Sequence, residues 1–106
     1  MESTKKMAKG YWVANIDVTD MDGYKLYAVA NAEPFRKYGA KFLTRGGKSE
    51  HVEGQLRSRI VVIEFPDYQA ALDCYHSPEY QKAKVLRIGK GVGEITVVEG
   101  YDGAQP

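Results

Sequence analysis

The chain has 106 residues, of which 43% are hydrophobic and 27% charged. This length allows one domain with a single core. The 15 basic and 14 acidic side chains leave a net charge of +1, so no basic surface is expected to attract nucleic acid or an anionic membrane. A single cysteine, Cys74, excludes an intramolecular disulfide and suits a reducing, cytoplasmic setting.

The ends of the chain differ from its middle. Residues 1–8 are polar and lysine-rich with no apolar stretch behind them, which predicts a disordered lead-in. Residues 102–106 predict an equally disordered tail. No linker divides residues 9–101, which are expected to form one domain. No apolar run approaches the roughly 20 residues that span a bilayer.

The first segment of this domain predicts a strand followed by a helix. Gly10–Val18 is rich in the aromatic and β-branched residues that favour strands. Asp20 or Asp22 can cap a helix whose apolar side chains recur at helical spacing as far as Tyr38. Pro34 lacks a backbone N–H, so a kink or a restart is expected late in this helix.

Two further strands are predicted in the middle of the chain. Ala40–Arg45 predicts a second strand, which ends at the polar turn GGKSE. His51–Glu53 is expected to begin an extended ribbon, with Gly54 as a bulge or turn. Arg57–Phe65, with four consecutive apolar residues at its centre, predicts the third strand.

The last part predicts two helices and a fourth strand. Asp67 can cap a helix that runs to about His76, and Ser77 with the following proline starts another that ends near Ile88. Three glycines then lead into a strand over Glu94–Tyr101. The resulting order, β-α-β-β-α-β, predicts an α+β, ferredoxin-like domain with a four-stranded antiparallel sheet.

Both faces of this sheet are apolar. In a ferredoxin-like domain the helices cover one face, and the other face is polar if it contacts water. The third strand is apolar on both faces, and the first places Trp12, Ala14 and Ile16 on one side with Tyr11 and Val13 on the other. A soluble monomer rarely exposes such a patch, so we expect a homodimer that packs sheet against sheet.

Several motifs are weak indicators of chemistry. The glycine-rich run at 87–93 follows a helix and precedes a strand, which is the reverse of a phosphate-binding loop. Cys74 and His76 lie two residues apart on a predicted helix and point to different sides, so no metal site is expected. Cys74 is also more typical of a buried small hydrophobe than of a nucleophile.

Polar residues within the apolar strands are the stronger candidates. Asn15 and Asp17 share a face of the first strand, Arg45 ends the second, and Arg59 and Glu64 lie near the two ends of the third. A buried charge must be paired or solvated. These residues therefore either tie strand ends together or form a polar cluster in a pocket, and alternation alone does not fix their faces, since one bulge reverses it.

Aromatic residues offer a wall for such a pocket. The tyrosines at 24, 27 and 38 fit one helix stripe and are explained first by core packing. Tyr75 and Tyr80 flank the helix break at 77–78, and with His76 they can rim a cleft between helix and sheet, a common place for a small ligand.

Three motifs in order identify a resemblance. LTRGGKSEHVEG, RSRIVVIEFPD and CYHSPEYQKAKVLR together resemble the family known as domain of unknown function 1330, over nearly all of the chain from about Lys9 to Gly100. That family belongs to the dimeric α/β-barrel superfamily, so the resemblance implies a ferredoxin-like dimer whose two sheets form a barrel. The superfamily includes cofactor-free monooxygenases, lactone isomerases, haem-degrading enzymes and stress-response proteins.

Two functions follow as expectations. In the first, each subunit binds or transforms a small organic molecule, without a cofactor, in a pocket between sheet and helices. Arg45 would orient an anionic or carbonyl group, and Glu64 or Asp17 would act as acid or base. The expected ligand-binding residues are Asn15, Arg59, Tyr75, His76 and Tyr80. In the second, the protein is a non-catalytic dimeric structural or stress-response module whose charges hold strand ends together.

Overall fold

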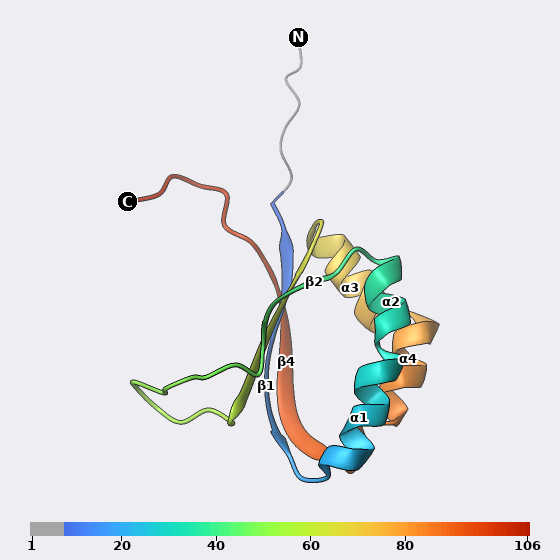
Figure 1. The fold of residues 1–106 in the computed structure, drawn as a ribbon. Helices are drawn as coiled ribbons and strands as arrows, with labels where there is room; N and C mark the ends of the chain where they lie inside the picture. Colours follow the sequence, from blue (N-terminus) through green and yellow to red (C-terminus); the bar gives the residue numbers. More distant parts are fainter. Residues whose placement is uncertain (1–7) are drawn as a thin grey trace.

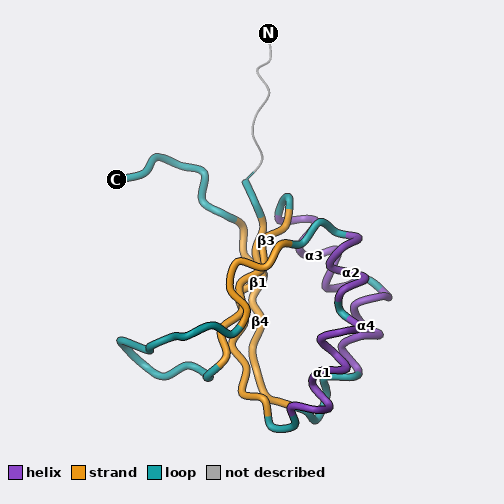
Figure 2. Tube along the Cα trace, in the orientation of Figure 1, coloured by secondary structure: helices purple, strands orange, loops and turns teal. Residues whose placement is uncertain are grey.

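The computed structural model describes residues 8–106, so the predicted lead-in at 1–8 falls almost entirely outside the described residues. The elements in chain order are β1 (Gly10–Val18), α1 (Met21–Ala30), α2 (Ala32–Lys37), β2 (Lys41–Arg45), β3 (Arg59–Phe65), α3 (Tyr68–His76), α4 (Pro78–Val85) and β4 (Gly91–Glu99). All the helices lie on one side of a single sheet (Figure 1). The tube in Figure 2 shows the same two layers by type of structure.

The sheet has the strand order β2-β3-β1-β4, and all three neighbouring pairs are antiparallel. β1 lies between β3 and β4, with Trp12 opposite Ile63 on one side and Val97 on the other. This is the predicted α+β, ferredoxin-like arrangement with a four-stranded antiparallel sheet, which is therefore confirmed.

The predicted caps begin three of the helices. The carboxylate of Asp20 accepts a hydrogen bond from the Gly23 N–H at 3.0 Å, and that of Asp67 accepts one from the Ala70 N–H at 2.8 Å. The Ser77 hydroxyl accepts the Tyr80 N–H at 3.1 Å. Each cap satisfies a backbone donor that has no partner inside its helix.

The break predicted near Pro34 separates α1 from α2. α1 ends at Ala30, and Asn31 stands between the two helices. A residue at position 34 would normally donate its N–H to the carbonyl of residue 30, and proline has no such donor. The helical chain therefore turns at Asn31, and this turn directs the Asn31 side chain to a buried position.

The glycine-rich segment differs from its prediction. α4 ends at Val85 rather than near Ile88, and β4 already begins at Gly91. A Cβ at Gly91 would lie 2.7 Å from the Asp17 carbonyl oxygen, and one at Gly93 would lie 2.6 Å from that of Asn15. These glycines are thus part of the strand, because the backbone of β1 approaches them too closely for any side chain.

The loop between β2 and β3 also differs. β3 begins at Arg59 rather than Arg57, and His51–Glu53 forms no strand. The segment 46–58 instead projects from the side of the sheet opposite the helices (Figure 1). Gly54 has a φ of 75°, a turn conformation that glycine adopts without strain.

The two faces of the sheet have the composition that alternation predicts. The inner face, which we define as the face under the helices, carries the buried side chains Trp12, Ala14, Ile16, Val61, Ile63 and Phe65. The opposite, outer face carries the apolar residues Val13, Ile60, Val62 and Val98 beside Asn15, Asp17, Glu64 and Glu94. Val13 and Val98 are 42% and 44% exposed, so the outer face is uncovered in a single chain.

Trp12 is the centre of the inner core. It is 1% exposed, and its indole N–H donates to the Ala71 carbonyl at 2.8 Å. Its ring lies 5.2 Å from that of Phe35 and 4.9 Å from that of Tyr80, in edge-to-face arrangements that aromatic pairs prefer. Trp12 thereby joins the sheet to α2, α3 and α4.

Candidate functional site

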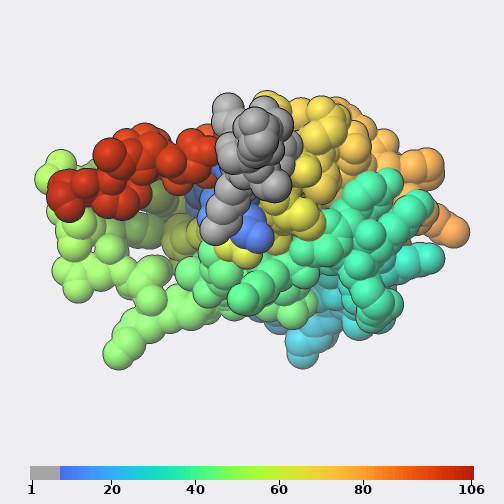
Figure 3. Space-filling model, turned by 90° about the horizontal axis from the view of Figure 1, so that it is seen from above, coloured from blue at the N-terminus to red at the C-terminus, as the bar shows by residue number. Residues whose placement is uncertain are grey.

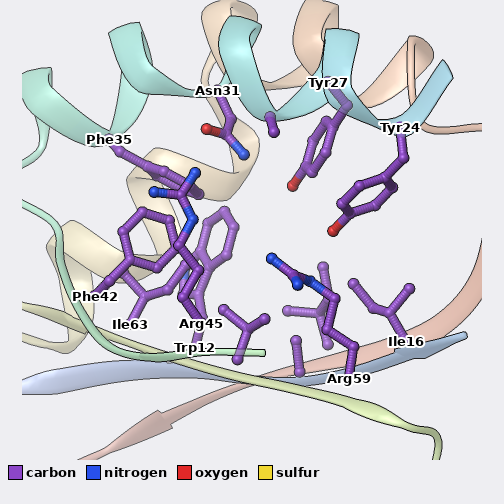
Figure 4. Close-up of a pocket in the computed structure, with 14 residues that line it drawn as sticks. Trp12, Ile16, Tyr24, Tyr27, Asn31, Phe35, Phe42, Arg45, Arg59 and Ile63 are labelled. Atoms are coloured by element: carbon purple, nitrogen blue, oxygen red, sulfur yellow. The ribbon is translucent and has the colours of Figure 1, made fainter. Parts of the chain in front are cut away.

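A cavity lies between the inner face of the sheet and the helices α1 and α2 (Figure 4). Its volume is about 30 Å³, which is room for about one or two water molecules. The lining is apolar with a few polar groups, as is usual for small-molecule sites. It consists of Trp12, Ala14, Ile16, Tyr24, Tyr27, Ala28, Asn31, Phe35, Phe42, Arg45, Arg59, Val61, Ile63 and Ile95.

Two arginines rise into this cavity from the sheet. Arg59 lies opposite Ile16 of β1, so it shares the inner face. Arg45 lies opposite Val61 and faces the same way. Figure 4 shows both guanidinium groups pointing from the strands toward the helices.

A β-bulge in β2 places Arg45 on this face. Phe42 and Arg45 are three residues apart, a spacing that puts side chains on opposite faces of a regular strand. The register shifts between Phe42 and Thr44, so both Phe42 and Arg45 point inward. The Thr44 hydroxyl bridges the interrupted ladder by donating to the Ile60 carbonyl at 3.2 Å and accepting the Val62 N–H at 3.0 Å.

The glycine after Arg45 makes room for Arg59. Gly46 has a φ of 75°, and a Cβ there would collide with the guanidinium of Arg59. The Gly46 N–H donates to the Ile60 carbonyl at 2.9 Å, which holds the turn beside β3. The end of β2 therefore affects both arginines. It carries Arg45 itself, and Gly46 leaves space for the side chain of Arg59.

Neither arginine has an acidic partner in the part of the chain that the structure describes. The Arg59 Nε is buried and makes no hydrogen bond there. Its guanidinium carbon lies 5.8 Å from the centre of the Tyr24 ring, and that of Arg45 lies 4.1 Å from the centre of the Phe42 ring. The aromatic rings stabilise the cations, but they leave most of the N–H donors free.

The helices supply the polar groups opposite the arginines. Asn31 is 5% exposed and lines the cavity, and its side chain does not cap α2. Tyr24 and Tyr27 project from α1 into the same space (Figure 4). An amide carries both donors and an acceptor, so Asn31 is suited to bind a ligand's polar atom.

Tyr27 is linked to a second buried phenol. Its hydroxyl lies 2.7 Å from that of Tyr80. Burial raises the pKa of Tyr27 well above its ordinary value, and the neighbouring Tyr80 raises it further. Burial also raises the pKa of Tyr80. Both phenols are therefore protonated at neutral pH, and they serve as hydrogen-bonding groups rather than as bases.

The cavity lining has a one-sided charge. Its ionisable members are Tyr24, Tyr27, Arg45 and Arg59, with no carboxylate or imidazole among them. Such a lining can bind and stabilise negative charge. It offers no carboxylate or imidazole as a general base.

The predicted aromatic wall lies beside this cavity rather than in it. Tyr80 is fully buried and reaches the cavity only through Tyr27. Tyr75 is half-buried against Trp12, with its hydroxyl accepting a hydrogen bond from the Lys84 ammonium at 2.9 Å. His76 is exposed at the end of α3. None of the three lines the cavity.

The expected placement of Asn15, Asp17 and Glu64 in the same pocket must be corrected. Arg59 pairs with Ile16, so the residues on either side of Ile16 point to the outer face. Glu64 lies opposite Tyr11 on that face and accepts the Tyr11 hydroxyl at 3.4 Å. The sheet thus separates these three residues from Arg45 and Arg59, because side chains alternate between its faces.

On the outer face, Asn15 and Asp17 secure the loop that precedes β3. Asn15 Oδ1 accepts the Arg57 N–H at 3.1 Å, and Asp17 Oδ1 accepts the Ser58 N–H at 2.9 Å. Arg57 also forms ion pairs with Asp17 at 3.2 Å and with Glu94 at 2.9 Å. The hydrogen bond from the Ser58 backbone is the main cause of the lowered pKa of Asp17.

Twelve of the 14 lining residues were not among the predicted site residues, and Tyr24, Tyr27, Asn31 and Phe42 are the most informative of them. The two tyrosines fitted a core stripe, and packing alone explained them. Asn31 carried a signal, because a polar residue on an apolar helix stripe just before a proline break marks a buried amide. Phe42 carried none, since its direction depends on the bulge.

Other features of the described residues add no chemistry. Residues 8–106 contain no group of three His, Cys, Asp or Glu side chains able to hold a metal ion. Burial raises the pKa of Cys74 to about 12, which leaves its thiol unreactive at neutral pH. No helix in this range has the length and apolar character needed to cross a bilayer.

Comparison with solved structures supports the fold. A protein of unknown function from Rhodopseudomonas palustris, RPA0582, is similar with a TM-score of 0.72 and 13% identity, over 91% of this chain and 85% of that one. Its methylated form has a TM-score of 0.72 at 12% identity, over 93% and 85%. SnoaB, a cofactor-independent oxygenase from Streptomyces nogalater, has a TM-score of 0.59 at 12% identity, over 93% and 96%.

Comparison of the sequence identifies the family. No curated protein matches the chain. The family model described as "Domain of unknown function (DUF1330)" matches residues 9–101, which confirms the resemblance drawn from the three motifs. The chain therefore belongs to the DUF1330 family.

Proposed function

We propose that the protein binds a small organic molecule in the cavity between the inner face of the sheet and the helices α1 and α2. The observation that carries this proposal is the lining itself. Aromatic walls surround two arginines without acidic partners in the described chain, and the Nε of one of them, Arg59, is buried without a hydrogen bond. Polar groups left without partners are costly in a core built only for packing.

Any reaction in this cavity would depend on the stabilisation of negative charge. Arg45, Arg59 and the Tyr27 hydroxyl can hold an oxyanion that forms on a bound substrate. The lining has neither a carboxylate nor an imidazole, so the substrate would have to lose its own proton readily. The likeness to a cofactor-independent oxygenase supports chemistry of this kind, an oxygenation or isomerisation that needs no cofactor.

A ligand screen tests the proposal. Trp12 is the only tryptophan in the chain and lines the cavity, so its fluorescence reports occupancy directly. Small aromatic, lactone and carboxylate compounds are screened for changes in Trp12 fluorescence and melting temperature. A hit should be lost in Arg45→Ala and retained in Arg36→Ala, which removes an exposed charge outside the cavity.

The same screen separates the alternative function. A non-catalytic module predicts that no compound shifts the melting temperature and that Arg45→Ala changes stability alone. The outer-face network of Asn15, Asp17 and Arg57 favours a structural role for those particular residues. It carries no information about the cavity on the other side of the sheet.

We also propose that the protein is a homodimer in which two outer faces pack together. Val13 and Val98 are exposed there beside Ile60 and Val62. The loop 46–58 and the segment after β4 both extend beyond this face, away from the helices (Figure 3). Val52, Leu56 and Tyr101 on these two arms are 82%, 60% and 72% exposed.

A second copy is the occupant that this surface fits. Two-fold packing would place the apolar centre of one sheet on that of the other, while the arms of each chain would bracket its partner. Soluble proteins rarely leave patches of this kind in water. The dimeric α/β barrel that the resemblance to this family implies agrees with this arrangement.

Sedimentation measures the assembly. The protein should sediment at about twice the 11.9 kDa mass of one chain. Val13→Lys places a charge in the proposed interface and should produce monomers. Val29→Lys, at a position 76% exposed on α1, is the matched control and should leave the dimer intact. A wild-type monomer at micromolar concentration would contradict the proposal.

A further inference from the structure

The cavity has a charge that specifies its ligand more narrowly than size does. Arg45 and Arg59 point into one small volume, and no acidic residue lines it. An anion bound in this volume would interact favourably with both cations. Arg57, in the loop just before β3, pairs with two carboxylates, whereas neither cavity arginine has one within the described residues.

The geometry points to a carboxylate on a small aromatic ring as the ligand of this cavity. This inference rests on the proposed function, since it assigns a chemical class to the molecule bound there. The carboxylate would accept hydrogen bonds from the Arg45 and Arg59 guanidinium groups. A guanidinium matches the planar, two-oxygen geometry of a carboxylate better than that of a hydroxyl or a carbonyl.

The aromatic part of the ligand follows from the walls. Phe35 contacts the ring of Trp12 at 5.2 Å and that of Phe42 at 5.5 Å, both edge to face. A flat ring extends such a cluster with the same preferred geometry. The Asn31 amide lies on the helical side of the cavity, opposite the sheet that carries the arginines (Figure 4), where it can bind a second polar substituent.

The cavity must open to admit a ring. Its volume of about 30 Å³ holds a water molecule or two but no ring. Arg45 is exposed and contacts the Phe42 ring at 4.1 Å, so its side chain can swing outward at little cost. Arg59 is half-buried and confined beside Gly46. We therefore expect the Arg45 side chain to change position when the ligand enters, whereas the Arg59 side chain stays in place.

Three probes separate charge from shape. Benzoate carries both the ring and the carboxylate, benzamide carries the ring without the charge, and acetate carries the charge without the ring. Titration of the full chain in the millimolar range, followed by Trp12 fluorescence and melting temperature, should show binding of benzoate. Benzamide and acetate should bind at least about tenfold more weakly, because each lacks one of the two recognised features.

Variants assign the binding to the arginines. Arg59→Met should weaken benzoate binding at least about tenfold and leave benzamide binding unchanged. Arg45→Met repeats the test at an exposed position where the core is not disturbed. Arg36→Met removes a positive charge outside the cavity and should bind benzoate like the wild type.

The outcomes distinguish the two proposals. If benzamide binds as tightly as benzoate, or if Arg45→Met and Arg59→Met fold and still bind benzoate normally, recognition of a carboxylate is wrong while small-molecule binding in the cavity stands. If neither ring compound changes Trp12 fluorescence or the melting temperature, the ligand class is wrong. If the wider screen also gives no hit, the proposed function fails with it.

Discussion

Arg57 and Arg59 are two residues apart in the chain, yet they lie on opposite faces of the sheet and in opposite electrostatic settings. Arg57 forms ion pairs with Asp17 and Glu94 on the outer face. Arg59 lies under the helices with no carboxylate partner in the described chain, and its Nε is buried without a hydrogen bond. Arg57 therefore has its ionic partners within the fold, whereas Arg59 has no acidic partner among the described residues and is available to bind an anionic ligand.

This contrast separates two kinds of polar residue within a sheet. Asn15 and Asp17 accept hydrogen bonds from the backbone of residues 57 and 58, so they hold a loop in place. Arg45 and Asn31 keep their hydrogen-bonding capacity and direct it into the cavity. Whether a polar residue already has hydrogen-bond or ionic partners within the fold is therefore a better guide to a binding site than its charge.

The largest expected effect is on the inner face. Trp12→Ala should reduce the free energy of unfolding by about 3–5 kcal/mol, because it removes a fully buried ring and leaves a cavity. Val98→Ala, made in the Val13→Lys background that is expected to be monomeric, is the control for truncation of an exposed side chain and should cost far less. Urea unfolding measures both. Equal losses would mean that the two faces contribute alike to the core.

The buried phenol pair gives the next largest effect. Tyr80→Phe leaves the Tyr27 hydroxyl without its 2.7 Å partner and should cost about 1–3 kcal/mol. The double variant Tyr27→Phe, Tyr80→Phe removes both hydroxyls and should recover part of that loss, but not all of it, because the Arg87 guanidinium loses its acceptor at 3.5 Å. Chemical denaturation of the three variants completes a double-mutant cycle. Additive losses would show that the two hydroxyls do not interact.

Two glycines with the same backbone conformation sharpen the comparison. Gly46 and Gly54 both have a φ of 75°, but only at Gly46 would a Cβ collide with Arg59. Alanine at either position should cost about 1–2 kcal/mol for the left-handed backbone. Gly46→Ala alone should also displace the guanidinium of Arg59 and change Trp12 fluorescence. If Gly54→Ala changes that fluorescence equally, the placement of Arg59 does not depend on Gly46.

The smallest effect concerns acid and the outer face. The folded-state pKa of Asp17 lies below the ordinary value of 3.8, chiefly because of the hydrogen bond from the Ser58 backbone. The carboxylate therefore stabilises the fold above pH 3.8, and this contribution is lost as the pH falls through its lowered folded-state pKa. Asp17→Asn should make the melting temperature less sensitive to acid in that range. An unchanged pH profile would contradict this assignment.

Much of the fold was predictable because it depends on local chemistry. Caps at Asp67 and Ser77 and the proline break gave the helices, and alternation gave the faces of Trp12 and Val13 correctly. The glycines of β4 were harder, since their place in the strand results from close contact with β1. That contact is between residues more than 70 positions apart, which no local pattern encodes.

The site was predictable only in part, for two physical reasons. Arg45 and Arg59 were expected at a pocket between sheet and helices, and the structure places both in the cavity there. Asp17 and Glu64 were assigned to the same pocket, but the antiparallel register sends them to the other face. Register is a property of paired strands, and a single strand's sequence does not fix it.

The bulge in β2 has a consequence for how this strand can change in length. It absorbs Leu43 as an additional residue, since Phe42 and Thr44 lie opposite the adjacent residues Ile63 and Val62. Loss of Leu43 would therefore restore a regular ladder and still leave Arg45 opposite Val61. In evolutionary terms, deletion of the Leu43 codon would leave the Arg45 side chain directed at the cavity. Insertion of a residue after Thr44 would instead turn Arg45 to the opposite face.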